Sequence, residues 1–323
     1  MNRIRKTAAE HRAAEHRADA LRTDALRTHA DEGYAKAQSN LGFMYYNGQG
    51  VPQDHAQAVI WFRKAADQGL AGAQFNLGFM YSHGQGVPED DAQAVSWFRK
   101  AADQGDAVAQ YNLGLMYENG RGVPQDYAQA FSWYRKAADQ GDDGAQSNLG
   151  FMYASGQGVP QDYAQAVSWF RKAADQGYTT AQINLGNMYN DGRGVPQNYA
   201  RAASWYRKAA DQGHTLAQYN LGNMYNDGRG VPEDDAQAVS WFRKAAEQGD
   251  PDAQINLGNM YRDGHGVPQD YVQAVAWYRK AAEQDNANAQ INLGIMYLNG
   301  HGVPRDHDEA VRWFLQVGAS RTR

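Results

Sequence analysis

The feature that most restricts the fold of this 323-residue chain is a 36-residue period that recurs eight times without an insertion. Leu-Gly, Val-Pro and a tryptophan each return at this spacing, and the series uses all 8 tryptophans. They are Trp61, Trp97, Trp133, Trp169, Trp205, Trp241, Trp277 and Trp313. A fixed period of roughly 20 to 50 residues is typical of a solenoid, whose units bury their apolar sides only against their neighbours.

Each repeat is predicted to contain two helices. In the first copy, apolar residues from Ala37 to Tyr45 recur at three- and four-residue spacings, which predicts a first helix over about residues 34–47. Gly42 lies inside that helix, where glycine costs up to about 1 kcal/mol against alanine. Because all eight copies keep this glycine, we expect a neighbouring helix to approach its backbone closely.

A glycine-rich turn is predicted to end the first helix. Gly48 and Gly50 suit left-handed backbone conformations, and Pro52 is expected in the first turn of the second helix. The second helix is predicted to run to about residue 68, with Trp61 on its buried face. Arg63 and Asp67 stand four residues apart, so a weak surface ion pair is expected between them.

The domain organisation follows from the period. Residues 1–32 are predicted to be a helical N-terminal cap formed from a decayed half-repeat, because Ala25–Glu32 aligns with Trp61–Gln68 at an offset of one period. A targeting peptide is a weaker alternative, since the segment contains acidic residues. The eight repeats span 33–320, as 33–68, 69–104, 105–140, 141–176, 177–212, 213–248, 249–284 and 285–320.

The repeat motif also resembles a known family. In the first copy it consists of Ala37-Gln38, Asn40-Leu41-Gly42, Met44-Tyr45, Gly48, Gly50-Val51-Pro52, Asp54, Ala58, Trp61 and Arg63-Lys64-Ala65-Ala66. This motif resembles the Sel1-like repeat, a relative of the tetratricopeptide repeat. Departures are Asp285 for a boundary glycine, Asn198 for an aspartate, and Leu315 for an arginine. The resemblance implies an all-α fold, a right-handed superhelical solenoid of antiparallel helix pairs, and an adaptor role.

Specificity is expected in the positions that vary between copies. On the first helix these are 36, 39, 43, 46 and 47 with their equivalents, which share one face opposite the core. In the related tetratricopeptide fold the matching face lines a concave groove. We define it here as the first-helix face, and predict that a peptide or protein segment binds it.

The predicted partner-binding residues change in character along the chain. The earlier copies supply an apolar, largely aromatic set: Phe43, Tyr46, Phe75, Phe79, Tyr111, Leu115 and Phe151. Copies five to seven supply a polar set: Asn187, Asn190, Asp191, Asn223, Asn226, Asp227, Asn259, Arg262 and Asp263. Aromatic anchors are typical of binding hot spots, and aligned Asn side chains suit the backbone of an extended peptide. Recent duplication of these copies explains the Asn set equally well.

Signs of chemistry are absent from the sequence. The G-x-G pairs are turn glycines, no H-E-x-x-H or S-x-x-K motif occurs, and His265 and His301 alone are too few for a zinc site. No catalytic residue, cofactor or metal is therefore predicted. Two alternatives stay open. One is β-lactam or cell-wall-related binding or hydrolysis, as described for some secreted relatives. The other is a structural rod that self-associates end to end through its C-terminal repeat.

Composition narrows the partners further. The net charge of -5 gives no reason to expect nucleic acid, and the chain has no cysteine for disulfides or thiolate metal sites. No apolar run approaches the roughly 18 residues of a membrane span, and the N-terminus lacks the apolar core of a signal peptide. A cytoplasmic protein that neither inserts into membranes nor binds nucleic acid is expected.

Overall fold

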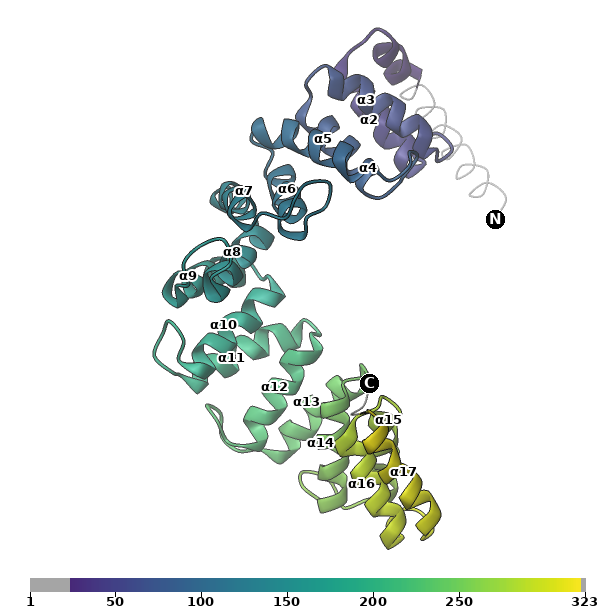
Figure 1. The fold of residues 1–323 in the computed structure, drawn as a ribbon, viewed down its shortest axis with the longest axis vertical. Coiled ribbons are helices and arrows are strands. Elements are labelled where there is room, and N and C mark those ends of the chain that lie inside the picture. Colours follow the sequence, from purple (N-terminus) through teal and green to yellow (C-terminus); the bar gives the residue numbers. More distant parts are fainter. Residues whose placement is uncertain (1–23, 321–323) are drawn as a thin grey trace, which may run out of the picture. The chain divides into compact units, whose positions relative to one another are not determined.

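The structure, a computed structural model, describes residues 24–320, and all of their regular secondary structure is helical (Figure 1). Helices follow one another as pairs, and the chain divides into two compact units at Gln161 and Asp162. The helices of unit 1 are α2 (Ala35–Asn47), α3 (His55–Asp67), α4 (Ala71–Ser82), α5 (Asp91–Asp103), α6 (Ala107–Asn119), α7 (Tyr127–Asp139) and α8 (Asp143–Ser155). An all-α repeat architecture is thereby confirmed.

Unit 2 continues the same pattern of pairs. Its helices are α9 (Tyr163–Asp175), α10 (Thr179–Asp191), α11 (Tyr199–Asp211), α12 (Thr215–Asn226), α13 (Asp235–Glu247), α14 (Pro251–Asp263), α15 (Tyr271–Ala282), α16 (Ala287–Asn299) and α17 (His307–Ser320). Even-numbered helices are the first helices of repeats and odd-numbered ones are the second helices. Within each unit, a helix packs against the helix before it and the helix after it.

The predicted N-terminal cap is described only in part. Its first 23 residues lie outside the described residues, while residues 24–31 are helical. Ala30 is buried in a cluster with Ala37 and Leu41 of the first complete repeat. The capping role of residues 1–32 stays a prediction.

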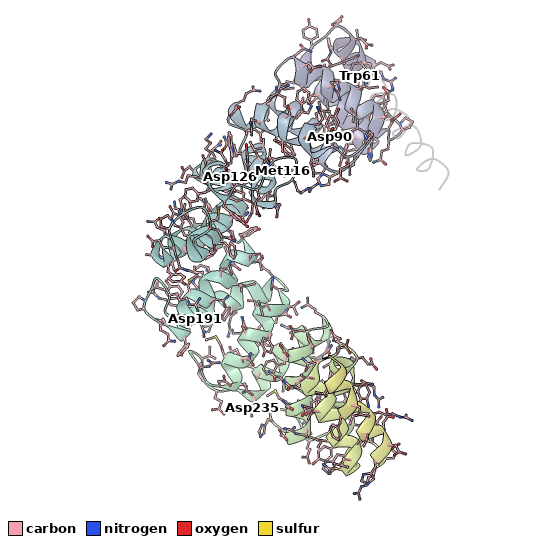
Figure 2. All side chains as sticks on the ribbon, in the orientation of Figure 1. Trp61, Asp90, Met116, Asp126, Asp191 and Asp235 are labelled. Carbon is pink, nitrogen blue, oxygen red and sulfur yellow. The ribbon has the colours of Figure 1, made fainter. Side chains whose placement is uncertain are left out.

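Helix ends follow the capping chemistry of the sequence. Gly48 and Gly50 both have φ of 70°, which confirms the two left-handed turn glycines. Asp54 caps α3 by accepting a hydrogen bond from the backbone N–H of Gln57 at 3.0 Å. Asp90 and Asp126, labelled in Figure 2, cap α5 and α7 in the same way.

The expectation for Pro52 was wrong. Pro52 precedes α3, which begins at His55 after the cap residue Asp54. The side chain of Asp54 accepts a hydrogen bond from a free N–H in the first turn, so the helix begins at the next residue. Val51-Pro52 therefore stays in the connecting segment. In the final copy, Asp285 takes a left-handed φ of 60° at a site where earlier copies have glycine.

Close helix approach explains the glycine within each first helix. A Cβ placed on Gly42 would lie 2.7 Å from Cδ1 of Phe62, a side chain on α3 that is 1% exposed. No real Cβ contact is that short, so alanine there would push the two helices apart. The second turn glycine serves the contact between repeats, because a Cβ on Gly86 would overlap the backbone carbonyl of His55.

Glutamine pairs, each with one buried and one exposed member, help to join successive repeats. The Nε2 of Gln74 donates to the carbonyl of Ala66 at 3.1 Å, and its Oε1 accepts from Nε2 of Gln104 at 2.7 Å. The same pattern recurs at Gln110 with Gln140 in unit 1, and at Gln218 with Gln248 in unit 2. The buried amides of Gln74, Gln110 and Gln218 have partners for both their oxygen and their nitrogen, so these three are satisfied within the stack.

The predicted ion pair between Arg63 and Asp67 was wrong in the first copy. Arg63 instead donates from Nη2 to the hydroxyl of Tyr81 in the next repeat. The equivalent pair does form in the third copy, where Nε of Arg135 lies 3.0 Å from Asp139. An exposed ion pair is worth little in water, so a half-buried phenol on the neighbouring repeat competes successfully for the guanidinium.

Candidate functional site

Aromatic residues of the first-helix face in unit 1 surround one hollow, which we call the aromatic hollow. It has a volume of about 180 Å³ and lies between the first two repeats. The residues that line it are Phe43, Tyr46, Phe62, Phe75, Asn76, Phe79 and Met80. The structure thus brings together four of the predicted binding residues: Phe43, Tyr46, Phe75 and Phe79.

Ring contacts hold these four side chains in place. Phe43 packs edge-to-face on Phe62 with ring centroids 5.2 Å apart, and still leaves 43% of its surface exposed. Phe79 stacks on His83 at 4.1 Å, and Phe75 lies 6.5 Å from Phe79. The rings are therefore held by the repeat framework while their outer faces border the hollow.

The other apolar residues of the predicted set do not line the aromatic hollow. Tyr111 packs on Tyr134 with ring centroids 5.8 Å apart, and Leu115 is half-buried. Phe151 is 50% exposed on α8. Exposed apolar side chains of this size are candidates for contacts, but Phe151 stands apart from the four residues above.

The three aligned asparagines of unit 2 are already hydrogen-bonded, two within their own repeats and one to the next repeat. Oδ1 of Asn187 accepts a hydrogen bond from the hydroxyl of Tyr206 at 2.6 Å. Oδ1 of Asn259 accepts from the hydroxyl of Tyr278 at 2.7 Å. Asn223 accepts from Nδ2 of Asn256 in the next repeat at 3.1 Å. The carbonyl oxygens of all three asparagines thus have partners. What Asn187 and Asn259 can still offer a binding partner is their amide N–H donors.

Neighbouring polar residues also bond to each other. Nδ2 of Asn190 donates to Asp191 at 2.9 Å, and Nδ2 of Asn226 donates to Asp227 at the same distance. In the following copy Arg262 forms two hydrogen bonds to Asp263, the shorter at 2.7 Å.

Four of the predicted binding residues, Asn226, Asn259, Arg262 and Asp263, border a polar hollow of about 230 Å³ in unit 2. Its lining consists of Asn226, Phe242, Asn256, Asn259, Met260, Arg262, Asp263 and His265.

Burial and hydrogen bonding change the acidity of several groups on this face. Burial raises the pKa of Tyr278 from 10.0 to about 12, and it raises the pKa values of Tyr206 and Tyr134 as well. The hydrogen bond from Arg262 lowers the pKa of Asp263 below 3.8. The three phenols therefore stay neutral donors at physiological pH, which is the form that their acceptors need.

A relation between the two helices of a repeat escaped the sequence reasoning. Tyr134 donates its buried hydroxyl to Glu118 of the same repeat, as Tyr206 does to Asn187. Where the second helix has phenylalanine instead, as at Phe62, the first helix carries Phe43. The signal was available, because a tyrosine in that position coincides with an acceptor on the first helix.

The described residues offer no site for a metal ion, since no group of three or more His, Asp or Glu side chains is arranged to hold one. His301 stacks on Tyr271 with ring centroids 4.6 Å apart. In the same part of the chain, no helix is long and apolar enough to cross a membrane.

Comparison with known proteins identifies the repeat. The profile of the Sel1 repeat family matches residues 35–70, 71–106, 107–142, 144–178, 179–214, 215–250, 251–286 and 287–316. The chain belongs to the Sel1 repeat family. The matched segments begin two or three residues after the repeat boundaries taken from the sequence, at or within a residue of each first helix.

Two solved structures are similar to this Sel1 repeat protein over most of its length. The protective antigen c5321 of uropathogenic Escherichia coli, which displays an SLR fold, is 42% identical with a TM-score of 0.89. That match covers 92% of this chain and 64% of the E. coli chain, so this chain spans less than two thirds of that relative. A Sel1 repeat protein from Oxalobacter formigenes is 40% identical with a TM-score of 0.71, over 92% of this chain and 86% of that one.

A comparison with curated proteins found no match. The fold is an all-α solenoid of the SLR type, and Sel1 repeat proteins generally mediate protein–protein interactions. Folds of this kind typically act as non-catalytic interaction scaffolds, and none of the matches indicates a catalytic family.

Proposed function

We propose that this Sel1 repeat protein is a non-enzymatic scaffold that binds a peptide or protein segment on its first-helix face. The observation that carries the proposal is the aromatic hollow, where Phe43, Tyr46 and Phe79 present ring surface around a space of about 180 Å³. Buried aromatic contacts dominate the energetics of protein interfaces, and a hollow between rigid helices needs little rearrangement to accept a side chain.

The chemistry of the aromatic hollow specifies the kind of segment. Its lining carries aromatic rings, one methionine and a single amide, that of Asn76, and has no charged group. We therefore expect the partner segment to insert a bulky apolar side chain. Polar groups beside that anchor would meet the hydroxyl of Tyr46 and the amide of Asn76.

The test uses a peptide selected from a random library for binding to the intact chain. Its affinity is then measured for the intact chain and for a variant with both Phe43→Ala and Phe79→Ala. We expect at least tenfold weaker binding, since loss of a hot-spot anchor costs about 2 kcal/mol or more. Ile60→Ala is the matched control, because Ile60 is 46% exposed but does not line the aromatic hollow.

Several outcomes separate this proposal from its alternatives. Undiminished peptide affinity in the double variant would remove the aromatic hollow as the binding site. Turnover of nitrocefin by the purified chain would replace the scaffold with a β-lactam hydrolase. A cytoplasmic location is part of the proposal, and fractionation of cells that produce the chain tests it.

Association with a second copy is a second candidate, and it rests on α17. Leu315 is 70% exposed there and Val311 is 53% exposed, on a helix where earlier copies place arginine at the position of Leu315. If this surface joins two copies, Leu315→Arg will lower the sedimentation coefficient at high protein concentration. An unchanged, concentration-independent value for the original chain excludes this association.

A further inference from the structure

A third hollow, which we call the arginine hollow, lies in unit 2 and shares no lining residue with the polar hollow. It has a volume of about 300 Å³ and is formed by α9, α10 and α11. The residues that line it are Arg171, Tyr189, Arg201, Ser204, Trp205 and Lys208. None of these was predicted to bind a partner.

One part of the arginine hollow is a hydrogen bond between arginine and tyrosine that recurs along the chain. In six repeats an arginine of the second helix donates to a tyrosine hydroxyl of the next repeat, as Arg171 does to Tyr189 at 2.8 Å. The other such pairs are Arg63–Tyr81, Arg99–Tyr117, Arg207–Tyr225, Arg243–Tyr261 and Arg279–Tyr297. A phenol is a neutral acceptor, so these bonds leave the charge of the guanidinium uncompensated.

The other part of the arginine hollow is a second arginine, Arg201, which the fifth copy alone has at this position. Arg201 occupies a position that is Gln165 in the preceding copy and Gln237 in the following one. Its Nη1 donates to the same Tyr189 hydroxyl at 3.1 Å, and its guanidinium carbon lies 5.4 Å from the centroid of the tyrosine ring. Two guanidinium groups therefore converge on one neutral oxygen.

A second replacement in the same copy removes a negative charge close by. The cap residue of α11 is Asn198, whereas the caps of α9 and α13 are Asp162 and Asp234. Asn198 accepts a hydrogen bond from the backbone N–H of Arg201, so the two replaced positions are in direct contact. Compared with its neighbours, this copy has gained one positive charge and lost one negative charge within a single helical turn.

The local charge is not neutralised by the protein. Lys208 adds a third cation, with its Nζ 3.8 Å from the centroid of the Trp205 ring. The six lining residues include no acid, and neither Arg171 nor Arg201 belongs to an ion pair in the described part of the chain. Like charges held this close repel each other, and a bound anion would relieve that repulsion.

We propose that the arginine hollow binds a phosphate group. Guanidinium groups donate in a planar fork that matches phosphate oxygens, and two such forks with an ammonium group favour a dianion over a singly charged carboxylate. The exposed hydroxyl of Ser204 supplies a further donor at the edge of the site. The phosphate group comes either as the free anion or on a phosphorylated side chain of a partner protein.

The first experiment titrates the intact chain with inorganic phosphate by calorimetry, at constant ionic strength set with sodium chloride. We expect one saturable site per chain, and at least tenfold weaker binding in Arg201→Gln. Since Gln occupies this exposed position in neighbouring copies, the variant is expected to fold. Affinity should also fall as the pH is lowered, because protonation converts inorganic phosphate from a dianion to a monoanion that pairs less strongly with the two guanidinium groups. Binding unchanged by Arg201→Gln, or displaced equally by chloride, overturns the proposal.

A gain of function in the next repeat provides an independent check. The double substitution Asp234→Asn with Gln237→Arg copies both replacements beside Arg207 and Tyr225, where the framework pair already exists. We expect the stoichiometry for phosphate to rise from one to two. A stoichiometry that stays at one would show that the two replacements do not make the site.

Matched peptides then identify the source of the phosphate group. Binding of a phosphoserine peptide but not of its serine counterpart, more tightly than inorganic phosphate, assigns the site to a modified protein partner. Equal affinity for the phosphopeptide and the free anion assigns it to free phosphate. The Phe43→Ala and Phe79→Ala variant should bind phosphate normally, which separates this site from the first-helix face.

Discussion

The first-helix faces of the two units are built on the same framework but present different chemistry. In unit 1, Phe43 and Phe79 border an open aromatic hollow. In unit 2, the equivalent positions hold Asn187 and Asn259, whose carbonyl oxygens are bonded to tyrosines of their own repeats. The contrast shows that a polar surface can be the less available one, because its acceptors already have partners.

In two repeats of unit 2 the difference accompanies a hydroxyl group on the second helix. Phe62 and Phe98 of unit 1 need only apolar neighbours, whereas Tyr206 and Tyr278 bring a buried hydroxyl that must find an acceptor. Copy three of unit 1 follows the same rule, since Tyr134 donates to Glu118. Substitutions in both units test how far this rule explains the two faces.

The largest effect on the free energy of unfolding is expected when a first-helix glycine is replaced by alanine. A Cβ on Gly258 would lie 2.6 Å from Tyr278, and one on Gly78 would lie 2.8 Å from Phe98. Gly258→Ala should lower the free energy of unfolding by about 3 kcal/mol in urea titrations, and Gly78→Ala by about 2 kcal/mol. The tyrosine cannot move without weakening its bond to Asn259, whereas the phenylalanine can.

The control for this pair is Gly72→Ala. Gly72 lies in α4 with no atom within 4 Å of an added Cβ, so alanine there should stabilise the chain by about 0.5 kcal/mol. Equal losses for Gly78→Ala and Gly258→Ala would contradict the role given to the tyrosine hydroxyl.

A smaller effect is expected when the acceptor alone is removed. Asn187→Leu leaves the hydroxyl of Tyr206 buried without its partner, and should lower the free energy of unfolding by about 2 kcal/mol. Adding Tyr206→Phe should recover most of that loss, because the repeat then resembles those of unit 1. A double-mutant cycle by urea unfolding measures the coupling, and purely additive losses would show that the pair is not coupled.

Alkaline pH should weaken unit 2 through the same tyrosines. The pKa of Tyr278 is raised from 10.0 to about 12 in the folded chain, so the unfolded chain ionises first as pH rises. Stability is therefore fully present below pH 10 and is lost between pH 10 and pH 12. Thermal melts across this range should show a smaller loss for Tyr278→Phe than for the original chain, with an equal loss counting against the assignment.

The smallest effect is expected at the exposed Arg262–Asp263 pair. The hydrogen bond from Arg262 lowers the pKa of Asp263, so its contribution is present above the unfolded pKa near 3.8 and is lost as pH falls through the lower folded value. Exposed pairs are worth less than about 1 kcal/mol, so Asp263→Asn should change the melting temperature only slightly at pH 7. A large loss would mean that the pair organises the polar hollow.

Much of the fold could be predicted from the sequence because the framework repeats. The spacing of apolar residues placed α2 within one residue of its observed start, and the turn glycines adopt the expected backbone. The predictions for Pro52 and for the partner of Arg63 were wrong. Both depend on competing hydrogen-bond partners that a rule for one isolated helix does not include. Asp54 competes as a cap, and Tyr81 of another repeat competes as an acceptor.

The candidate site was harder to predict than the fold. Sequence position shows which side chains share a face, and Phe43, Tyr46, Phe75 and Phe79 do gather at one hollow. It does not show whether an amide such as Asn187 is already bonded, since that depends on a second-helix residue nineteen positions later. The arginine hollow was missed for a similar reason, because Arg201 looked like an ordinary exchange on an exposed face.

The glutamine pairs have a consequence for the insertion and deletion of repeats. The buried glutamine donates to a backbone carbonyl of the preceding repeat, as Gln74 does to Ala66, so the bond does not depend on which copy comes before. An internal unit of 36 residues can therefore be deleted or duplicated with this bond retained, whereas a shift of a few residues would leave a buried amide without its partner. The number of repeats can thus change by whole units. Each added repeat brings its own variable first-helix positions and leaves those of the other repeats unchanged.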